Sequence, residues 1–427
     1  MTIAGLYDLY LRHPSVQTDT RQLRPGDLFF ALKGPNFNAN LLAITALEAG
    51  AAYAVVDEFP ATDDPRLIKV ANVLETLQQL AGHHRRQLDI PVLAITGSNG
   101  KTTTKELVHA VLQTTYRTAT TKGNLNNHIG VPLTILRIPG DTEIAVIEMG
   151  ANHLGEIAGY CTYALPTHGL ITNTGKAHLE GFGSLEGVRK GKGELYDHLR
   201  EHAGTAFIMW DYDYLRDMSH GIPHKFTYGT NGGEDLTGTV ERNNDFLQVA
   251  ILKGADIPLL KTRLVGDYNL PNVLAAVAVG KYFKVGDIHI RSAIEAYTPT
   301  NSRSQMIQHG VNQVILDAYN ANPSSMAAAI ENFARMDAPA KVLMLGGMKE
   351  LGDESIEEHQ RLIDLIERYP WQAVALVGGD FAHVKHPFTF LPDTNKARAW
   401  LQQKAFEHAT ILIKGSRGIA MENVLES

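Results

Sequence analysis

The segment from Ile90 to Leu112 constrains the fold of this 427-residue chain more than any other stretch. An apolar run typical of a buried strand leads into a turn with two glycines, and a helical pattern opens directly after it with Lys101 and Thr102. Backbone N–H groups of such a turn, together with the N-terminus of the helix, cradle phosphate oxygens. We therefore predict an ATP site, in which Lys101 reaches the terminal phosphates and the Thr102 hydroxyl holds Mg²⁺. The alternative is a glycine turn followed by a chance Lys-Thr pair. The predicted phosphate loop comprises Gly97, Ser98, Asn99, Gly100, Lys101, Thr102 and Thr103.

Short apolar runs alternate with helical patterns along the chain, which predicts an α/β protein of three domains. Residues 1–88 form a mixed α/β N-terminal domain, whose last helix ends in the polar stretch 83–87, interpreted as a linker. Residues 89–297 form a central P-loop domain with a parallel sheet, and we expect antiparallel edge strands between Phe226 and Val265. Residues 298–427 form a smaller C-terminal, doubly wound, Rossmann-like domain.

The composition of the chain excludes several classes of function. The chain is 44% hydrophobic and 20% charged, with a net charge of −7, which is ordinary for a folded globular protein and argues against a general nucleic-acid binder. No apolar run is long enough to span a membrane, and the single cysteine, Cys161, excludes an intramolecular disulfide. We expect a cytoplasmic protein with neither a nucleic-acid nor a membrane partner.

Polar side chains follow two further predicted strands of the central domain. Glu148 ends the run 144–147, and His178 follows the run 170–172 by a few residues. Because the carboxyl ends of parallel strands face the ligand crevice, Glu148 is well placed to hold the metal, although a salt-bridged strand end would look the same. His178 could reach the same crevice or could be structural.

Two amide-rich segments are further candidates. Asn124, Asn126 and Asn127 lie in a polar loop, where amides suit a polar substrate, but a capped turn explains them almost as well. Asp317 and Tyr319 follow a C-terminal strand and precede a helix. They fit contacts to a base and a ribose, or simply the turn that opens the helix.

With these residues in view, the chain resembles the Mur ligases, the ATP-dependent amino-acid ligases of peptidoglycan synthesis. The matching motifs cover all three predicted domains, from residue 18 to residue 417. They are Thr18–Arg21, Gly26–Gly34, Thr96–Thr103, Gly123–Thr134, Glu148–Ile157, Ala177–Ser184, Asp317–Pro323, Lys349–Gly352 and Lys414–Arg417.

The resemblance implies roles for individual residues. The N-terminal domain would bind the UDP-linked substrate, and the C-terminal domain would close over the nucleotide and the second substrate. Lys192, which by its neighbours alone is an exposed lysine in a basic run, matches a family lysine that is carbamylated and binds metal together with Thr102, Glu148 and His178. The nucleotide would contact Asn269, Asn272, Arg303, Asp317 and Tyr319, and the UDP moiety Thr18, Asp19, Arg21, Lys33 and Gly34. Residues 37–40 lack the acid and histidine that members usually carry there.

The implied reaction joins D-alanyl-D-alanine to UDP-N-acetylmuramoyl-tripeptide. ATP would phosphorylate the terminal carboxylate of the tripeptide, and the amine of the dipeptide would then displace phosphate from the acyl phosphate. Lys101, Lys192 and His178 would be the catalytic residues, acting in a monomer. The alternatives are another Mur-type or folylpolyglutamate-type ligase, and a non-catalytic ATP-binding protein with the same fold.

Overall fold

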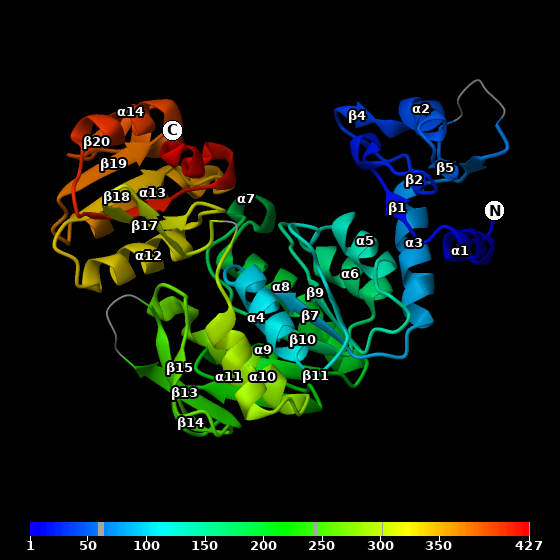
Figure 1. Cartoon of the computed structure of the whole chain (residues 1–427), viewed down its shortest axis with the longest axis horizontal. Helices are drawn as coiled ribbons and strands as arrows, with labels where there is room; N and C mark the ends of the chain where they lie inside the picture. The colour runs from blue at the N-terminus through cyan, green and yellow to red at the C-terminus, as the bar shows by residue number, and fades with distance from the viewer. Residues whose placement is uncertain (59–63, 242–245, 301, 427) are drawn as a thin grey trace.

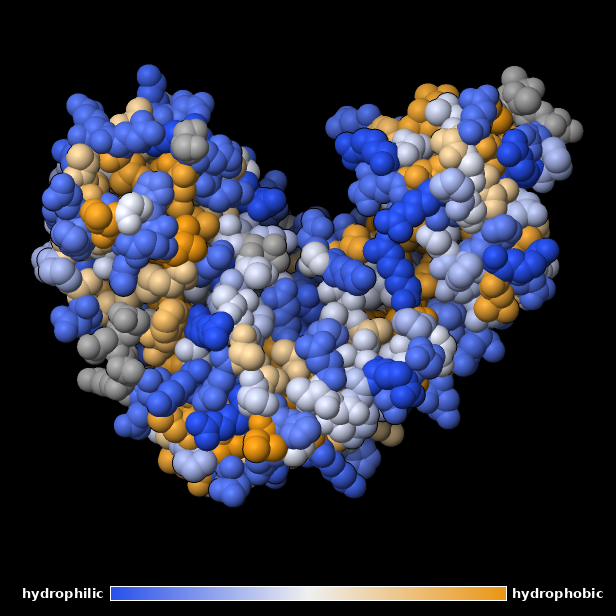
Figure 2. All heavy atoms as spheres, viewed as in Figure 1, coloured by the Kyte–Doolittle hydropathy of each residue, from blue (hydrophilic) through white to orange (hydrophobic). Residues whose placement is uncertain are grey.

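The computed structural model describes residues 1–58, 64–241, 246–300 and 302–426. Within them the chain forms three main sheets, each covered by helices, so the predicted three-domain α/β class is confirmed. Figure 1 shows the central sheet at the base, with the N-terminal and C-terminal parts rising from it as separate arms. The space between the two arms is a wide hollow in the space-filling view (Figure 2). No helix within the described ranges is long and apolar enough to cross a membrane.

The N-terminal arm contains a parallel sheet of strand order β1-β2-β5-β6. Its middle strands β2 and β5 are almost wholly buried, which is why their sequences are apolar runs without alternation. The elements are α1 (Ile3–Arg12), β1 (Val16–Gln17), η1 (Thr20–Gln22), β2 (Leu28–Phe30), the hairpin β3 (Lys33–Gly34) and β4 (Phe37–Asn38), η2 (Ala39–Leu42), α2 (Ala43–Glu48), β5 (Tyr53–Val56) and β6 (Leu67–Lys69).

Helix α3 (Val73–Arg86) corrects the interpretation of residues 83–87 as a linker. The helix continues through this stretch and packs against α5 (Gly130–Leu136) and α6 (Glu156–Ala164) of the central part. Its last turn buries Arg85, which donates to the carbonyl oxygens of Ala164 (3.1 Å) and Leu165 (3.2 Å). His84 and Arg85 therefore contact carbonyl groups inside the protein, while Arg86 and Gln87 of the same helix end are exposed. The predicted boundaries near residues 88 and 297 stay predictions.

The central sheet has the strand order β15-β14-β13-β12-β11-β10-β7-β9-β8. Strands β7 to β12 are all parallel to one another, so their carboxyl ends lie along the same edge of the sheet. The expectation of antiparallel strands between Phe226 and Val265 is right for β13 to β15, but wrong for β12, which is parallel to both neighbours. The strands are β7 (Val92–Thr96), β8 (Thr118–Thr120), β9 (Ile144–Glu148), β10 (His168–Ile171), β11 (Thr205–Met209), β12 (His224–Gly229), β13 (Leu236–Glu241), β14 (Gln248–Lys253) and β15 (Leu260–Lys261).

Helices cover both faces of this sheet. Two of them, α4 and α10, pack closely on each other, and α10 is buried along nearly its whole length. The helical elements are α4 (Lys101–Leu112), α7 (Leu179–Phe182), α8 (Leu185–Glu201), α9 (Asp213–Met218), η3 (Asp267–Asn269), α10 (Leu270–Tyr282) and α11 (Asp287–Ala296).

The C-terminal sheet has the order β16-β17-β21-β18-β19-β20. All its pairs are parallel except β16 with β17, so an antiparallel edge strand that the sequence analysis missed completes a doubly wound sheet. The elements are β16 (Gln305–His309), β17 (Asn312–Asp317), α12 (Pro323–Arg335), β18 (Lys341–Gly346), η4 (Gly352–Glu354), α13 (Ser355–Ile366), β19 (Ala373–Val377), η5 (Gly379–His383), β20 (Thr389–Leu391), α14 (Thr394–Lys404), β21 (Thr410–Lys414), η6 (Arg417–Ile419) and η7 (Met421–Leu425).

Candidate functional site

The turn between β7 and α4 needs both of its glycines. Gly97 has a φ of 139° and Gly100 a φ of 77°, backbone conformations that residues with a Cβ rarely adopt. A Cβ on Gly97 would lie 2.0 Å from the Thr172 hydroxyl, and one on Gly100 would lie 2.5 Å from Asn272 Oδ1. The turn is therefore held tightly against neighbouring strands and helices, with the N-terminus of α4 directly after it.

Lys101 folds back over this turn. Its Nζ donates to the carbonyl oxygens of Gly97 (2.7 Å) and Ser98 (3.2 Å). Burial lowers the pKa of Lys101 to about 8; the Glu148 carboxylate opposes this shift, and Arg303 adds to it. A lysine whose positive charge is only partly balanced, such as Lys101 at the N-terminus of a helix, is suited to bind a phosphate group.

Glu148 lies at the carboxyl end of β9 and is 1% exposed. Its carboxylate accepts hydrogen bonds from Thr102 Oγ1 (2.9 and 3.0 Å) and from Asn126 Nδ2 (2.8 Å). The structure thus brings the hydroxyl of the loop, the strand-end carboxylate and one of the three candidate amides into direct contact.

These residues line a cavity of about 990 Å³ between the central and C-terminal parts. Asn124, Asn127 and His178 line it as well, and so do all the predicted nucleotide contacts of the C-terminal domain. Asn127 also accepts hydrogen bonds from the backbone N–H groups of Ile129 (3.2 Å) and Gly130 (2.8 Å), so it caps a turn as the alternative interpretation expected.

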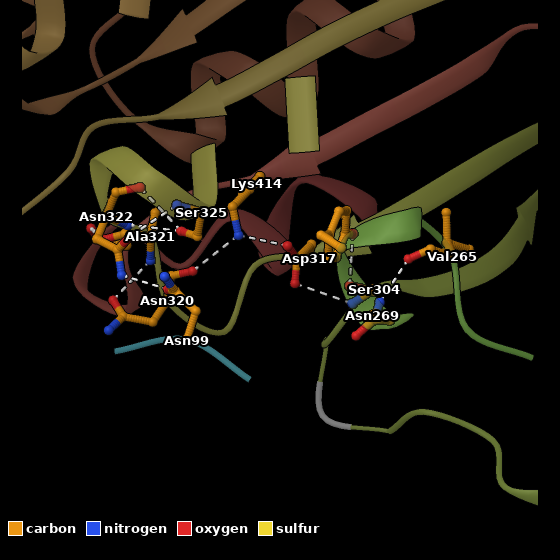
Figure 3. A network of polar contacts seen from close by, with 12 residues as sticks. Asn99, Val265, Asn269, Ser304, Asp317, Asn320, Ala321, Asn322, Ser325 and Lys414 are labelled. Carbon is orange, nitrogen blue, oxygen red and sulfur yellow. Dashed lines mark hydrogen bonds and ion pairs between the residues drawn. The ribbon is translucent and has the colours of Figure 1, made fainter. Parts of the chain in front are cut away.

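The two amides expected beside the nucleotide form a chain that leads to α4. Asn269 donates to the Val265 carbonyl (2.9 Å), and Asn272 donates to Asn269 Oδ1 (2.9 Å). Thr104 on α4 donates to Asn272 Oδ1 (3.0 Å). Both asparagines are buried and border the cavity, where Figure 3 shows Asn269 close to the C-terminal segment.

The C-terminal wall of the cavity is built around Asp317, at the carboxyl end of β17. Asp317 accepts from the Ser304 backbone N–H (3.1 Å) and forms an ion pair with Lys414 (2.6 Å) at the end of the neighbouring strand β21 (Figure 3). The Arg303 guanidinium lies 3.6 Å from the centre of the Tyr319 ring. Sequence reasoning gave Lys414 no role; its position at the carboxyl end of a predicted strand was the signal that could have found it.

The same wall contacts the phosphate loop directly. Asn322 donates from Nδ2 to Asn99 Oδ1 (2.8 Å), while its Oδ1 accepts from the Ser325 backbone N–H (2.9 Å) and caps α12 (Figure 3). Ser324 accepts from the Lys176 backbone N–H (3.0 Å). The N-terminal end of α12 therefore contacts the central part of the protein at the phosphate loop.

Lys192 on α8 is 1% exposed, so its interpretation as an exposed lysine is wrong. Its Nζ donates to the Ala151 carbonyl (2.7 Å), and burial lowers its pKa well below the ordinary value, with Lys101 contributing. Lys192 lies behind Ala151, which lines the cavity. The described residues hold no cluster of three or more His, Cys, Asp or Glu side chains that could bind a metal. Glu148 and His178 both line the cavity, but among the described residues no third side chain of these types joins them in such a cluster.

The predicted UDP-binding residues lie on the N-terminal arm, apart from this cavity. Asp19 pairs with Arg21 (2.7 Å), and Lys33 of the β3–β4 hairpin, next to Gly34, pairs with Glu58 (2.8 Å). Thr18 lies beside Asp19, after β1. The structure does not bring this group of residues together with the phosphate loop.

The unusual residues 37–40 have a structural task in this arm. Asn40 Oδ1 accepts the backbone N–H groups of Asp57 (3.0 Å) and Glu58 (3.2 Å), and Asn38 Nδ2 donates to Glu58 Oε2 (2.6 Å). These two asparagines therefore hold the segment that carries the carboxylate partner of Lys33.

Fold and site together define a phosphate-loop protein in which a Rossmann-like domain completes the nucleotide cavity. The Mur ligase middle domain family matches residues 95–280, and the family of the Mur ligase glutamate ligase domain matches residues 302–417. A UDP-N-acetylmuramoyl-tripeptide–D-alanyl-D-alanine ligase of Bacillus subtilis is 35% identical over 96% of this chain and 92% of its own length.

Solved structures of Mur ligases have the same fold as this chain. A MurF crystal structure from Acinetobacter baumannii has a TM-score of 0.87 and 30% identity, covering 96% of this chain and 92% of that one. A MurF ligase from Thermotoga maritima in complex with ADP has a TM-score of 0.87 and 26% identity, covering 98% and 97%. The chain belongs to the Mur ligase family.

Proposed function

We propose that this chain ligates D-alanyl-D-alanine to UDP-N-acetylmuramoyl-tripeptide and converts ATP to ADP and phosphate. The observation that carries the proposal is the single cavity in which Lys101, Thr102 and Glu148 face Arg303 and Asp317. The name of the Bacillus subtilis relative and the ADP bound to the Thermotoga maritima neighbour support the substrate and the nucleotide.

The chemistry requires an activated carboxylate, because a carboxylate has no good leaving group. An oxygen of the tripeptide carboxylate attacks the γ-phosphorus, the bond to the β-phosphate oxygen breaks, and ADP departs with the electron pair. The dipeptide nitrogen then attacks the acyl carbon and loses a proton, and phosphate leaves as the C–O bond breaks. Lys101 neutralises charge that develops on the transferring phosphoryl group, and docking of the C-terminal domain excludes water from the acyl phosphate.

The donor atoms at the loop fit Mg²⁺. A hard cation prefers oxygen ligands, and the Thr102 hydroxyl and the Glu148 carboxylate lie within 2.9 Å of each other. When bound there, Mg²⁺ would supply further neutralisation of phosphate charge. His178 is the proposed additional ligand from the same cavity, and Asn126 orients the Glu148 carboxylate through its 2.8 Å hydrogen bond.

Carbamylation of Lys192 is part of the proposal. A carbamate forms from CO₂ and an unprotonated amine, which loses a proton, and burial of Lys192 lowers its pKa in the required direction. Lys192→Ala is expected to be nearly inactive and partly rescued by a small carboxylate. Lys190→Ala, at an exposed position on the same helix, is the matched control with mild effects. Protein equilibrated with ¹³CO₂ should show a carbamate signal that Lys192→Ala alone removes; its persistence in that variant would contradict the assignment.

The N-terminal arm is the proposed site for the UDP moiety, through Thr18, Asp19, Arg21, Lys33 and Gly34. Lys33 would exchange its exposed pairing with Glu58 for a phosphate oxygen, at little cost because surface ion pairs contribute little. We propose that Asn124, Asn126 and Asn127 contact the peptide. A cytoplasmic monomer is the proposed working unit.

The decisive experiment measures ADP release by purified protein with muramoyl tripeptide, with and without D-alanyl-D-alanine. Release that depends on both substrates, together with formation of the pentapeptide product, is the expected result, and Lys101→Ala is the inactive control. Turnover with free amino acids but not with the dipeptide would indicate another ligase of the family. Absence of release with every acceptor would indicate a non-catalytic nucleotide-binding protein.

A further inference from the structure

One contact between the central and C-terminal domains involves a residue with no part in the proposed reaction. Glu350, from the loop after β18 of the C-terminal domain, reaches the cavity residue His178 of the central domain. Its Oε2, on a half-exposed side chain, lies 2.5 Å from His178 Nδ1, a buried ring nitrogen that is within ion-pair distance of the carboxylate but makes no hydrogen bond of ordinary geometry. The backbones meet as well, since Glu180 donates its N–H to the Glu350 carbonyl (3.3 Å).

Both partners have an unusual backbone conformation. His178 has a φ of 53° and Glu350 a φ of 62°, in the left-handed region that residues other than glycine seldom occupy. Such a conformation is unfavourable for residues with a Cβ and persists only where the surroundings impose it. In this contact, one such residue from each domain faces the other. The surrounding structure therefore imposes the backbone conformation of both residues at this contact between the domains.

The segment that carries His178 is also clamped from a second side. Lys176, two residues earlier, has its Nζ 2.5 Å from Glu358 Oε1 and 3.4 Å from Glu354 Oε2. The Glu358 side chain is only 5% exposed, and Arg361 holds the same oxygen at 2.5 Å. Figure 1 shows α7, which begins after His178, directly against the C-terminal domain.

We propose that Glu350 is a positioning residue, which fixes the His178 ring from the C-terminal domain and so makes a correctly set His178 conditional on domain docking. A carboxylate at Nδ1 selects the tautomer with the proton on that nitrogen. The Nε2 lone pair is then left for the cavity, where it can bind a cation or accept a proton. The role in catalysis rests on the proposed function, whereas the effect on the ring does not.

The first measurement is the ¹⁵N spectrum of histidine rings, with the His178 signals identified by their loss in His178→Gln. Wild-type protein is expected to show one dominant tautomer for His178. Glu350→Ala should shift the two ring nitrogens toward averaged values. Glu350→Gln keeps an acceptor oxygen and should restore most of the wild-type pattern. Asp353→Ala, which removes an exposed acid three positions further on, should change nothing.

The second measurement separates kcat from KM in the ADP-release assay. Glu350→Ala should lower kcat 10- to 100-fold, the usual range for partners that orient a ligating histidine. The KM for the UDP-linked substrate should stay unchanged, and Glu350→Gln should recover much of kcat. Wild-type ring signals in Glu350→Ala, or equal loss of kcat in Asp353→Ala, would overturn the proposal. If the ring responds but wild-type protein ligates nothing, the proposed function fails and the positioning contact stands.

Discussion

The ion pair between Lys414 and Asp317 allows the sharpest test of how the C-terminal wall of the cavity is held. The two side chains are 3% and 14% exposed, and their charged atoms lie 2.6 Å apart. Lys414 also donates to the Asn320 carbonyl (3.3 Å), and Asp317 also accepts from the Ser304 backbone N–H. Replacing Lys414 by Met keeps the length and apolar stem of the side chain and removes only the ammonium group.

The expected cost follows from these distances. At an effective dielectric constant of about 20, charges this close attract each other by about 6 kcal/mol. Desolvation of the two ions offsets much of that attraction, so the pair as a whole stabilises little. Removing one partner is different, because the other charge stays buried without compensation. We therefore expect Lys414→Met to lower the free energy of unfolding of the C-terminal domain by about 3–5 kcal/mol.

Tryptophan fluorescence can follow this domain selectively. Trp371 and Trp400 lie in the C-terminal domain, and Trp210 is the only other tryptophan of the chain, so a Trp210→Phe background isolates the signal. With a urea m-value of about 2 kcal/mol/M, the expected loss moves the midpoint down by roughly 1.5–2.5 M. Lys396→Met, at an exposed position on α14, is the matched control and should stay within about 0.5 kcal/mol of the background.

A double-mutant cycle with Asp317→Asn distinguishes pairing from general damage. Neutralising both partners should cost less than the sum of the single changes, by about 2 kcal/mol or more, because no uncompensated charge remains. Strict additivity, or a Lys414→Met midpoint equal to that of the control, would show that the pair does not hold the wall and would refute the reasoning.

The remaining predictions concern three other basic side chains, Lys101, His168 and Arg85. Lys101→Ala should lower kcat/KM for ATP by about 10²–10³-fold with an unchanged far-UV circular dichroism spectrum, and wild-type kcat/KM should fall above about pH 8, where Lys101 loses its proton. Burial lowers the pKa of His168 to about 4. Because the unfolded chain binds a proton there below pH 6.5 and the native chain does not, stability should fall between pH 6.5 and 4, by up to about 2 kcal/mol at pH 5. Urea midpoints at pH 7 and 5 should show a smaller drop for His168→Gln. Arg85→Ala leaves several buried carbonyl groups without a donor and should cost about 2–4 kcal/mol in thermal unfolding, whereas the neighbouring exposed Arg86→Ala should cost little.

The sequence was informative wherever structure is decided within a few neighbouring residues. The strand, glycine turn and helix around Lys101 follow one another as predicted, because chain geometry and glycine conformation are local properties. Buried strands such as β7 and β9 were visible as unbroken apolar runs. The short edge strands β16 and β20 lack such runs and were missed.

Charged residues were misjudged where distant segments satisfy them. Lys192 and Arg85 both lie in basic stretches, for which solvent exposure is the ordinary expectation. In the structure each donates to main-chain carbonyl groups far along the chain. The Lys192 acceptor is 41 residues away, and two of the Arg85 acceptors, Ala164 and Leu165, are 79 and 80 residues away. No local pattern encodes such acceptors, because any residue type offers a carbonyl.

The amides of the site show why some alternatives could not be separated from sequence alone. A turn that opens a helix and a contact in the functional site are rival explanations of the sequence around Asn322, yet one side chain does both. Its oxygen caps α12, while its nitrogen reaches Asn99 in the phosphate loop, 223 residues earlier. An amide carries a donor and an acceptor on opposite sides, so satisfying a local turn leaves the other half free for a distant partner. The capping pattern is therefore not evidence against a role in the site. Where an asparagine caps a helix that begins after the carboxyl end of a strand, the capping hydrogen bond orients the rest of the amide group toward the functional site.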